Sequence, residues 1–299
     1  MERCSVTSFS LFLLVVTLAF HSADAINRTL LFIFGDSFVD AGTNKFLVGS
    51  PGPFCPYGID YPTNISTGRV SNGYTSGDQL ARRMGYKETP LPYLALVNSS
   101  SSFMNGVNFA SGGSGIFDST GWHAIIKQFS TVRDNITAEL GTEEAARLLS
   151  QALFIVSDGG NDLGQYIRNR SISPDGEINF PVEELVQTYG KHFQELYKLG
   201  ARKFGIVGIP LLGSTPHLKA QLDPWEQFVI NNVALRFHDG TKKLLADLTE
   251  VGKECWNKGT DFTEDNIGVS CRNWNGPICP DRDQYLFFDT LHPTQRAAD

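Results

Sequence analysis

The chain has 299 residues, of which 41% are hydrophobic and 19% are charged, so it can bury a sizeable core in one large α/β domain or two small ones. Its formal net charge of -7 and its lack of any Lys/Arg cluster exclude a surface built to bind polyanions, so nucleic acid is not expected as a partner.

The first 25 residues have the pattern of a secretory signal peptide. Arg3 precedes the apolar stretch Leu11–Phe20 and the small residues around Ala23 and Ala25. This stretch is too short to cross a bilayer, which takes roughly 20 apolar residues, and no later segment is long enough. We therefore expect residues 1–25 to be removed and residues 26–299 to be secreted into the extracellular space, without a transmembrane segment.

The apolar run Leu30–Phe34 predicts a first buried strand that ends in Gly35-Asp36-Ser37. Such a turn places a serine hydroxyl at the carboxyl edge of a sheet, where open α/β folds build their sites. Gly-Asp-Ser is also ordinary turn chemistry, and a serine at a strand end is far more often a backbone cap than a nucleophile. A catalytic role for Ser37 therefore depends on partners elsewhere in the chain.

A long region rich in Gly, Pro, Ser and Asn follows, with a predicted short helix over Asp78–Met84. Its composition favours an ordered surface around a site. Further strands are predicted over Gly106–Ala110, Ala152–Val156 and Lys203–Val207, and a helix that starts at Thr142 leads into the third strand.

Two longer helices flank the fourth strand. Glu183–Leu199 is a predicted helix that ends at Gly200, and Asp223-Pro224-Trp225-Glu226 opens another that runs toward Leu248. Strands separated by helices predict βαβ crossovers and a mostly parallel sheet covered on both faces. A single three-layer α/β domain is therefore expected.

Polar turns follow the first three predicted strands at Ser37, Ala110–Gly113 and Gly159–Asp162. Parallel strands point their carboxyl ends the same way, so the turns should lie along one rim. The backbone N–H groups of Ser37 and Gly112 and the side chain of Asn161 are candidate donors to an oxyanion. For either glycine-rich turn by itself, a simple tight bend is the better explanation.

A serine hydroxyl needs a base, usually a histidine oriented by a carboxylate. His292 alone among the histidines has an aspartate, Asp289, three residues before it. On one turn of chain these side chains face the same way, although a surface ion pair has the same spacing. No Gly-x-Ser-x-Gly elbow is present, which excludes the usual α/β-hydrolase motif.

Asn-x-Ser/Thr sequons at Asn27, Asn64, Asn98, Asn135 and Asn169 are consistent with secretion, because glycans are attached to exposed loops on that route. Several of them are expected to be glycosylated.

The signal peptide contains Cys4, which leaves Cys55, Cys255, Cys271 and Cys279 in an oxidising compartment. There is no Cys-x-x-Cys pair and no histidine cluster, so no metal is expected. A bridge from Cys271 to Cys279 would close a loop rich in Asn, Gly and Pro, while the pairing of the other two stays open.

Taken together, these residues resemble the GDSL esterase/lipase family, the plant branch of the SGNH hydrolases. The resemblance rests on segments that occur in family order over nearly all of the chain after the signal: Phe34–Ser37 with Asp40 and Gly42, Thr67–Gly73, Asn108–Ile116, Gly159–Asp162, Leu199–Phe204 and Asp289–Thr294. It implies a flavodoxin-like parallel sheet with helices on both faces, and hydrolysis of carboxylic esters without a cofactor.

The resemblance also implies roles for particular residues. Ser37 matches the nucleophile, His292 the general base and later acid, and Asp289 the acid that orients the imidazole. Gly112 and Asn161 match the oxyanion donors.

Two of these assignments have qualifications that come from the same motifs. Gly113 is the alternative to Gly112, because the register of the adjacent glycines is uncertain by one. Asp36 and Asp162 are interpreted as carboxylates that stabilise turns.

Three departures from the family pattern stand out. The first is Gly42-Thr43-Asn44 in place of the common Gly-Asn-Asn. The second is Gly213-Ser214 in place of Gly-Cys, which removes an expected disulfide partner, so that Cys255 or Cys55 is left unpaired. Glu250–Asp283 contains no counterpart of the family's next apolar strand, and the family's closing helix has no counterpart after His292. We expect the sheet to lack an edge strand and the His292 segment to be poorly supported.

The sequence thus favours a secreted serine esterase or lipase that acts through an acyl-serine intermediate on a lipid or small-molecule ester. The alternative is a non-catalytic secreted glycoprotein that keeps the fold. Acyl-chain preference and oligomeric state are not indicated by any feature of the sequence.

Overall fold

The computed structural model describes residues 29–49, 55–97, 99, 102–117, 121–169, 180–248, 288 and 291–296. The predicted signal peptide, Asp289 and the cysteines Cys255, Cys271 and Cys279 lie outside these residues.

A sheet of four parallel strands forms the centre of the described chain. The strands lie in the order β2-β1-β3-β4, and their bounds are β1 Leu31–Gly35, β2 Val107–Asn108, β3 Leu153–Ser157 and β4 Lys203–Val207. All four predicted strands are confirmed, although β2 is only two residues long. Because the strands are parallel, their carboxyl ends meet at one edge, as the turn pattern predicted.

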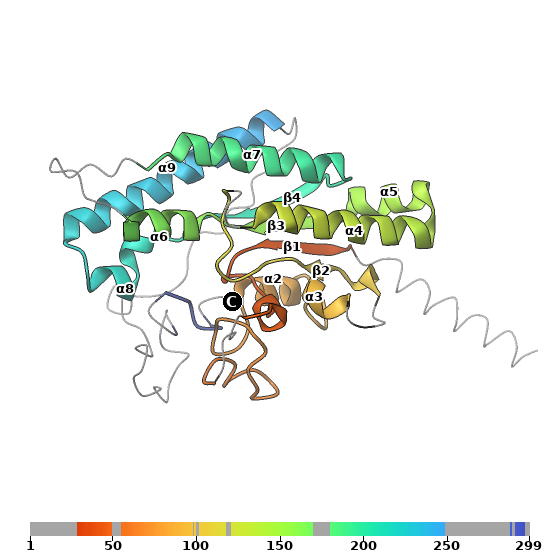
Figure 1. Ribbon diagram of the computed structural model, residues 1–299, viewed down its shortest axis with the longest axis horizontal. Coiled ribbons are helices and arrows are strands. Elements are labelled where there is room, and N and C mark those ends of the chain that lie inside the picture. Colours follow the sequence, from red (N-terminus) through yellow and green to blue (C-terminus); the bar gives the residue numbers. More distant parts are fainter. Residues whose placement is uncertain are drawn as a thin grey trace, which may run out of the picture.

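The helices and helical turns are α2 Ser76–Arg83, α3 Tyr93–Leu96, α4 Trp122–Leu140, α5 Thr142–Gln151, α6 Gly160–Asn169, α7 Val182–Lys198, α8 Pro216–Lys219 and α9 Pro224–Leu248, with 3-10 turns η1 Thr43–Phe46, η2 Phe103–Asn105 and η4 Leu212–Ser214. Figure 1 shows α7 and α9 above the strands and α2 below them. This arrangement is the three-layer α/β fold that the sequence predicts.

The capping chemistry of the two longest predicted helices is present. Asp223 Oδ1 accepts hydrogen bonds from the backbone N–H groups of Trp225 and Glu226, and Glu226 reaches back to the N–H of Asp223. At the end of α7, Gly200 adopts a φ of 111°, and the N–H of Ala201 bonds the carbonyl of Leu196. Both helices therefore begin and end within a residue of their expected positions.

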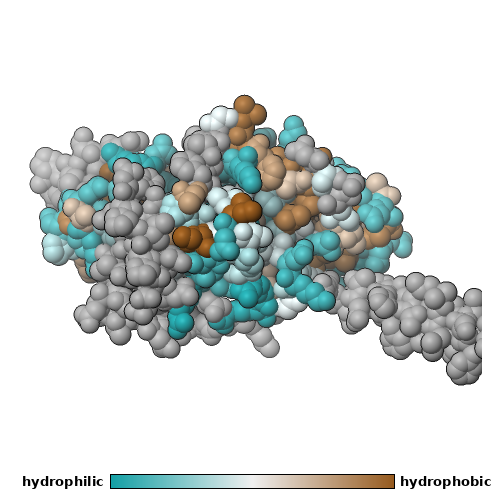
Figure 2. Space-filling view, turned by 90° about the horizontal axis from the view of Figure 1, so that it is seen from below, coloured by the Kyte–Doolittle hydropathy of each residue, from teal (hydrophilic) through white to brown (hydrophobic). Residues whose placement is uncertain are grey.

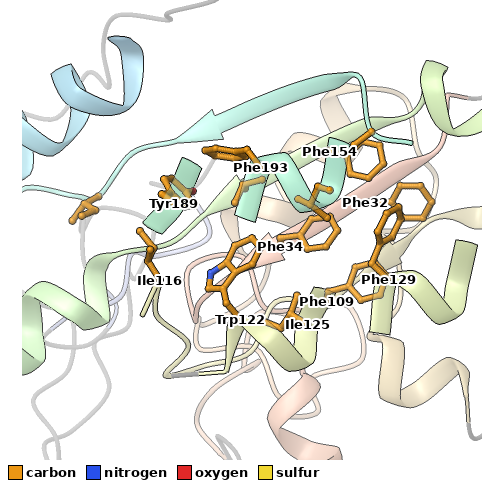
Figure 3. Packing of buried hydrophobic residues seen from close by; sticks show 14 of the residues in the cluster. Phe32, Phe34, Phe109, Ile116, Trp122, Ile125, Phe129, Phe154, Tyr189 and Phe193 are labelled. Atoms are coloured by element: carbon orange, nitrogen blue, oxygen red, sulfur yellow. The ribbon is translucent and has the colours of Figure 1, made fainter. Parts of the chain in front are cut away.

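The larger core cluster lies on the face of the sheet that α4, α5, α7 and α9 cover, and it is rich in aromatic rings (Figure 3). Phe34 of β1 stacks on Phe109 with ring centroids 4.9 Å apart, and Phe129 of α4 meets Phe32 edge-on at 5.3 Å. Burying each such ring contributes about 1.5–3 kcal/mol. The alternate residues of β1, Leu31 and Ile33, form a second cluster with α2 on the opposite face.

Strand β4 forms one edge of the described sheet, and Val207 on it is 40% exposed. Viewed from the α2 side, the described surface is mainly hydrophilic, with apolar residues in separate small groups (Figure 2). Among the described residues, no helix is both long and apolar enough to cross a membrane.

Candidate active site

The turn after β1 places Ser37 at the carboxyl edge of the sheet, and Gly35 makes that turn possible. Gly35 has a φ of 139°, and a Cβ built on it would lie 1.9 Å from the carbonyl oxygen of Ser157 on β3. Only glycine fits there. The N–H of Asp36 then donates to the same carbonyl at 3.0 Å, which directs the chain out of the sheet at Ser37.

His292 contacts Ser37, although the two residues are 255 positions apart in the sequence. Its Nε2 lies 2.8 Å from Oγ of Ser37, and its ring centroid lies 5.6 Å from that of Phe38. Asp289, the expected orienting acid, lies outside the described residues. The N–H of Phe288 donates to the carbonyl of His292 at 2.8 Å.

The segment after His292 is held by the first half of the chain. The N–H of Gln295 donates to Oδ1 of Asn72 at 2.8 Å, and Nε2 of Gln79 donates to the carbonyl of Gln295 at 3.0 Å. Thr294 and Phe288 are fully buried. The expectation that this segment is poorly supported is therefore wrong, because the Thr67–Gly73 loop and α2 support it.

The backbone N–H of Gly112 is already engaged in the structure. It donates to Oδ2 of Asp40 at 3.0 Å, while the Gly112 carbonyl accepts from Nδ2 of Asn44 at 2.8 Å. Gly113, the alternative donor, lines the same cavity as Ser37. Among the described residues, no hydrogen-bond acceptor is assigned to the Gly113 N–H.

Asn161 lies in the first turn of α6 and not in a loop, so the helix begins at Gly160, inside the expected polar turn. Its Nδ2 donates to the carbonyl of Ser114 at 2.7 Å, which uses one of the two amide hydrogens. No acceptor among the described residues is assigned to the second amide hydrogen. Ser37, Asn161 and His292 line one cavity of about 620 Å³.

Buried aspartates tie the turns of this rim together. Asp36 accepts from the N–H of Phe38 at 3.0 Å, and Asp40 accepts from the N–H groups of Gly42 and Thr43, both at 2.7 Å. Asp162 accepts from the N–H of Ile116 at 2.8 Å, and so joins α6 to the loop after β2. The interpretation of Asp36 and Asp162 as turn-stabilising carboxylates is confirmed.

These carboxylates are held close together away from water, which favours their neutral forms. Burial, reinforced by the charges of Asp162 and Asp40, raises the pKa of Asp36 to about 7, although the Phe38 N–H and the nearby His292 oppose the rise. Burial and the charge of Asp36 raise the pKa of Asp158 well above its ordinary value. The hydroxyl of Ser37 thus lies beside carboxyl groups that retain protons at unusually high pH.

Several supporting residues had no predicted role. Arg69, within the Thr67–Gly73 motif, forms a buried two-pronged ion pair with Asp78 at 2.6 and 2.9 Å and donates to the carbonyl of Ala41 at 3.0 Å. Trp122 donates its indole N–H to Asp158 at 2.5 Å. The Thr67–Gly73 motif contains Arg69 but gives no sign of its partner Asp78. Likewise, nothing in the sequence pairs Trp122 with Asp158.

Within the described part of the chain, Cys55 is exposed with a free thiol, and no cluster of His, Cys, Asp and Glu could hold a metal ion. Asn64 and Asn135 are exposed, but Asn135 lies within α4 and not on a loop. Asn27, Asn98 and the side chain of Asn169 lie outside the described residues.

The sequence matches the model of the GDSL-like lipase/acylhydrolase family over residues 31–299. It is 31% identical to GDSL esterase/lipase LTL1 of Arabidopsis thaliana, in an alignment that covers 99% of this chain and 90% of that protein. It is 30% identical to GDSL esterase/lipase At4g16230 of the same plant, with 89% of this chain and 83% of that protein covered. With GDSL esterase/lipase At5g37690, also from this plant, the identity is 29%, and the shares are 98% and 92%.

Proposed function

Because the chain belongs to the GDSL-like lipase/acylhydrolase family, we propose that it is a secreted serine esterase or lipase that hydrolyses carboxylic esters of an acyl lipid or an acylated small molecule. The observation that carries the proposal is the 2.8 Å distance between Nε2 of His292 and Oγ of Ser37. This distance is within hydrogen-bond reach, which a general base needs in order to take the hydroxyl proton.

In the proposed reaction, Oγ of Ser37 attacks the ester carbonyl carbon while its proton passes to Nε2 of His292. The tetrahedral intermediate then collapses, the C–O bond to the alcohol breaks, and His292 returns the proton to the departing alcohol. A water molecule then attacks the acyl-serine carbonyl while its proton passes to the same imidazole. The bond between the acyl carbon and Oγ of Ser37 breaks, His292 returns the proton to Oγ, and the acid leaves. By family resemblance, Asp289 stabilises the charged form of the ring.

The negative charge on the carbonyl oxygen requires neutral donors in the cavity wall. We assign them to the backbone N–H groups of Ser37 and Gly113 and to the second amide hydrogen of Asn161. Gly113 replaces Gly112 in this assignment because the Gly112 N–H is committed to Asp40. Each such donor typically contributes about 10²- to 10³-fold in rate.

The proposed secreted form consists of residues 26–299 after removal of the signal peptide 1–25, with glycans on a subset of the five predicted sequons. The exposure of Asn64 and Asn135 supports their modification. Expression in a secreting host followed by N-terminal sequencing would test the cleavage site, and a mass shift on glycosidase treatment would test the glycans.

The catalytic proposal is tested with a fluorophosphonate probe and a series of aryl esters of increasing acyl length. We expect the probe to label Ser37, and Ser37→Ala to abolish both labelling and turnover. Ser150→Ala on α5, which does not line the cavity, is the matched control and should change neither. Wild-type protein that neither reacts with the probe nor hydrolyses any ester of the series would contradict the proposal.

A further inference from the structure

One face of α6 lines the cavity that starts at Ser37. Asn161, Gly164 and Arg168 follow one another along this face at helical spacing, and all three border the cavity. The rise of an α-helix, 1.5 Å per residue, puts Gly164 about 4.5 Å and Arg168 about 10 Å beyond Asn161 along the axis. The cavity therefore runs along α6 from the reacting serine to an arginine.

The guanidinium of Arg168 lies over Gly164, on the side toward the reacting groups. Its Nη1 would be 3.7 Å from a Cβ built on Gly164, and apart from the adjoining residues and the backbone of α6, no other heavy atom of the described residues lies within 4 Å of that position. The absence of a side chain at Gly164 thus leaves the space between Asn161 and the guanidinium open.

Arg168 has no carboxylate partner among the described residues, whereas Arg69 pairs with Asp78 and Arg236 pairs with Glu183. Among the described residues that line the cavity, Asp36 is the one with a carboxyl group. It is buried beside Ser37, where it accepts a hydrogen bond from the N–H of Phe38. Within the described part of the chain, no carboxylate therefore neutralises the cation at the far end of the cavity.

Between these ends, aliphatic side chains form part of the wall, together with the polar side chains of His217 and Gln221. The aliphatic residues that border the cavity are Ile167, Leu212, Leu218 and Leu222, and the first three belong to the main core cluster. Arg168 itself is exposed, so an anion would reach it at the open end of the cavity through a charge-assisted hydrogen bond.

We propose that Arg168 binds an anionic group of the substrate, so that the preferred substrates are esters with a carboxylate or phosphate roughly 5–10 Å from the reacting carbonyl. This inference rests on the proposed esterase function and identifies its substrate class. Arg168 acts as a specificity-determining residue, and the bond-breaking steps do not involve it.

The kinetic test compares two acetate esters that differ in charge and share the same ring, 4-acetoxybenzoate and its methyl ester. We expect Arg168→Gln to lower kcat/KM for the anionic ester about 10- to 100-fold, the usual size of a lost hydrogen bond to a charged group, and to change the neutral ester less than about twofold. Arg168→Lys should retain part of the preference. Arg236→Gln, which removes an exposed arginine on α9, is the matched control and should change neither substrate.

A binding test separates this inference from the catalytic proposal, because amide analogues can be bound without turnover. Calorimetry with 4-acetamidobenzoate, 4-acetamidophenyl phosphate and methyl 4-acetamidobenzoate should show tighter binding of an anionic analogue. Arg168→Gln should abolish the difference in affinity between the anionic and the neutral analogues. Whichever of the two anionic analogues binds more tightly shows whether Arg168 prefers a carboxylate or a phosphate.

The outcomes of the two tests are distinct. Anion-selective binding that depends on Arg168 but is accompanied by no ester turnover supports the inference and contradicts the proposed hydrolysis. Turnover in which Arg168→Gln affects both esters equally, or neither, overturns the inference and leaves the hydrolase intact.

Discussion

The backbone N–H of Gln295 donates to Oδ1 of Asn72 at 2.8 Å, although the two residues are 223 positions apart. Asn72 is fully buried, and its Nδ2 also donates to Asp60 at 2.7 Å. Since Gln295 closely follows His292, this hydrogen bond fixes the base through the backbone next to it. The position of His292 thus depends on a loop that contributes no catalytic group of its own.

Replacing Asn72 with alanine removes this support while leaving Ser37 and His292 in place. We expect kcat to fall tenfold or more, because a shift of about 1 Å in a reacting group is enough to cost 10²-fold. The free energy of unfolding should fall by about 1–3 kcal/mol, because Asp60 and the Gln295 N–H lose their hydrogen bonds to Asn72. Steady-state kinetics on an aryl ester and urea unfolding measure the two effects.

Gln151→Ala, which shortens an exposed side chain at the end of α5, serves as the control for Asn72→Ala. It should leave kcat unchanged. If Asn72→Ala folds and retains full kcat, the loop does not position His292.

The strands and the long helix α9 were predictable because their signals are local. β4 has the bounds that its apolar run predicts, and the capping residues at Asp223 start α9 where expected. Helix α4 was not predicted, because Gly121 precedes it with no side-chain cap. Its buried stripe, Trp122, Ile125 and Phe129, was the one local sign of this helix.

Two glycines near the site should respond oppositely to alanine. Gly35→Ala places a methyl group against the carbonyl of Ser157 at a φ of 139°, so we expect a loss of about 3 kcal/mol or more, or failure to fold. Gly164→Ala meets only the end of Arg168 at 3.7 Å and should stabilise α6 by about 0.5–1 kcal/mol. Thermal unfolding of both variants measures the contrast, and equal effects would contradict the geometry.

The buried pair of Arg69 and Asp78 should be costly to break on one side. Arg69→Met leaves the Asp78 carboxylate buried at 1% exposure without its cation, and we expect a loss of about 3–5 kcal/mol. Adding Asp78→Asn removes the uncompensated charge and should restore part of the stability. A double variant no more stable than Arg69→Met would show that the charge itself is not the source of the loss.

The site residues were predictable to the extent that they lie in short motifs at strand ends. Ser37, Asn161 and His292 all border the cavity. The engagement of Gly112 was not predictable, because its partner Asp40 lies 72 positions away and neither residue type implies the other. Hydrogen bonds between loops depend on how the loops fold against each other, and sequence spacing does not encode that.

The raised pKa of Asp36 predicts how stability changes with pH. Burial keeps Asp36 protonated in the folded protein up to about pH 7, whereas an unfolded aspartate releases its proton near pH 4. The folded state therefore binds more protons between these values. The contribution of Asp36 to the free energy of unfolding is thus fully present below about pH 4 and is lost as the pH rises to about 7.

Asp36→Asn keeps an acceptor for the Phe38 N–H but cannot ionise. Relative to wild type, it should gain on the order of 2 kcal/mol in urea unfolding on going from pH 4.5 to pH 8. Asp134→Asn, on the exposed face of α4, should show no such gain, and identical pH dependence of wild type and Asp36→Asn would contradict a buried, protonated Asp36 beside the nucleophile.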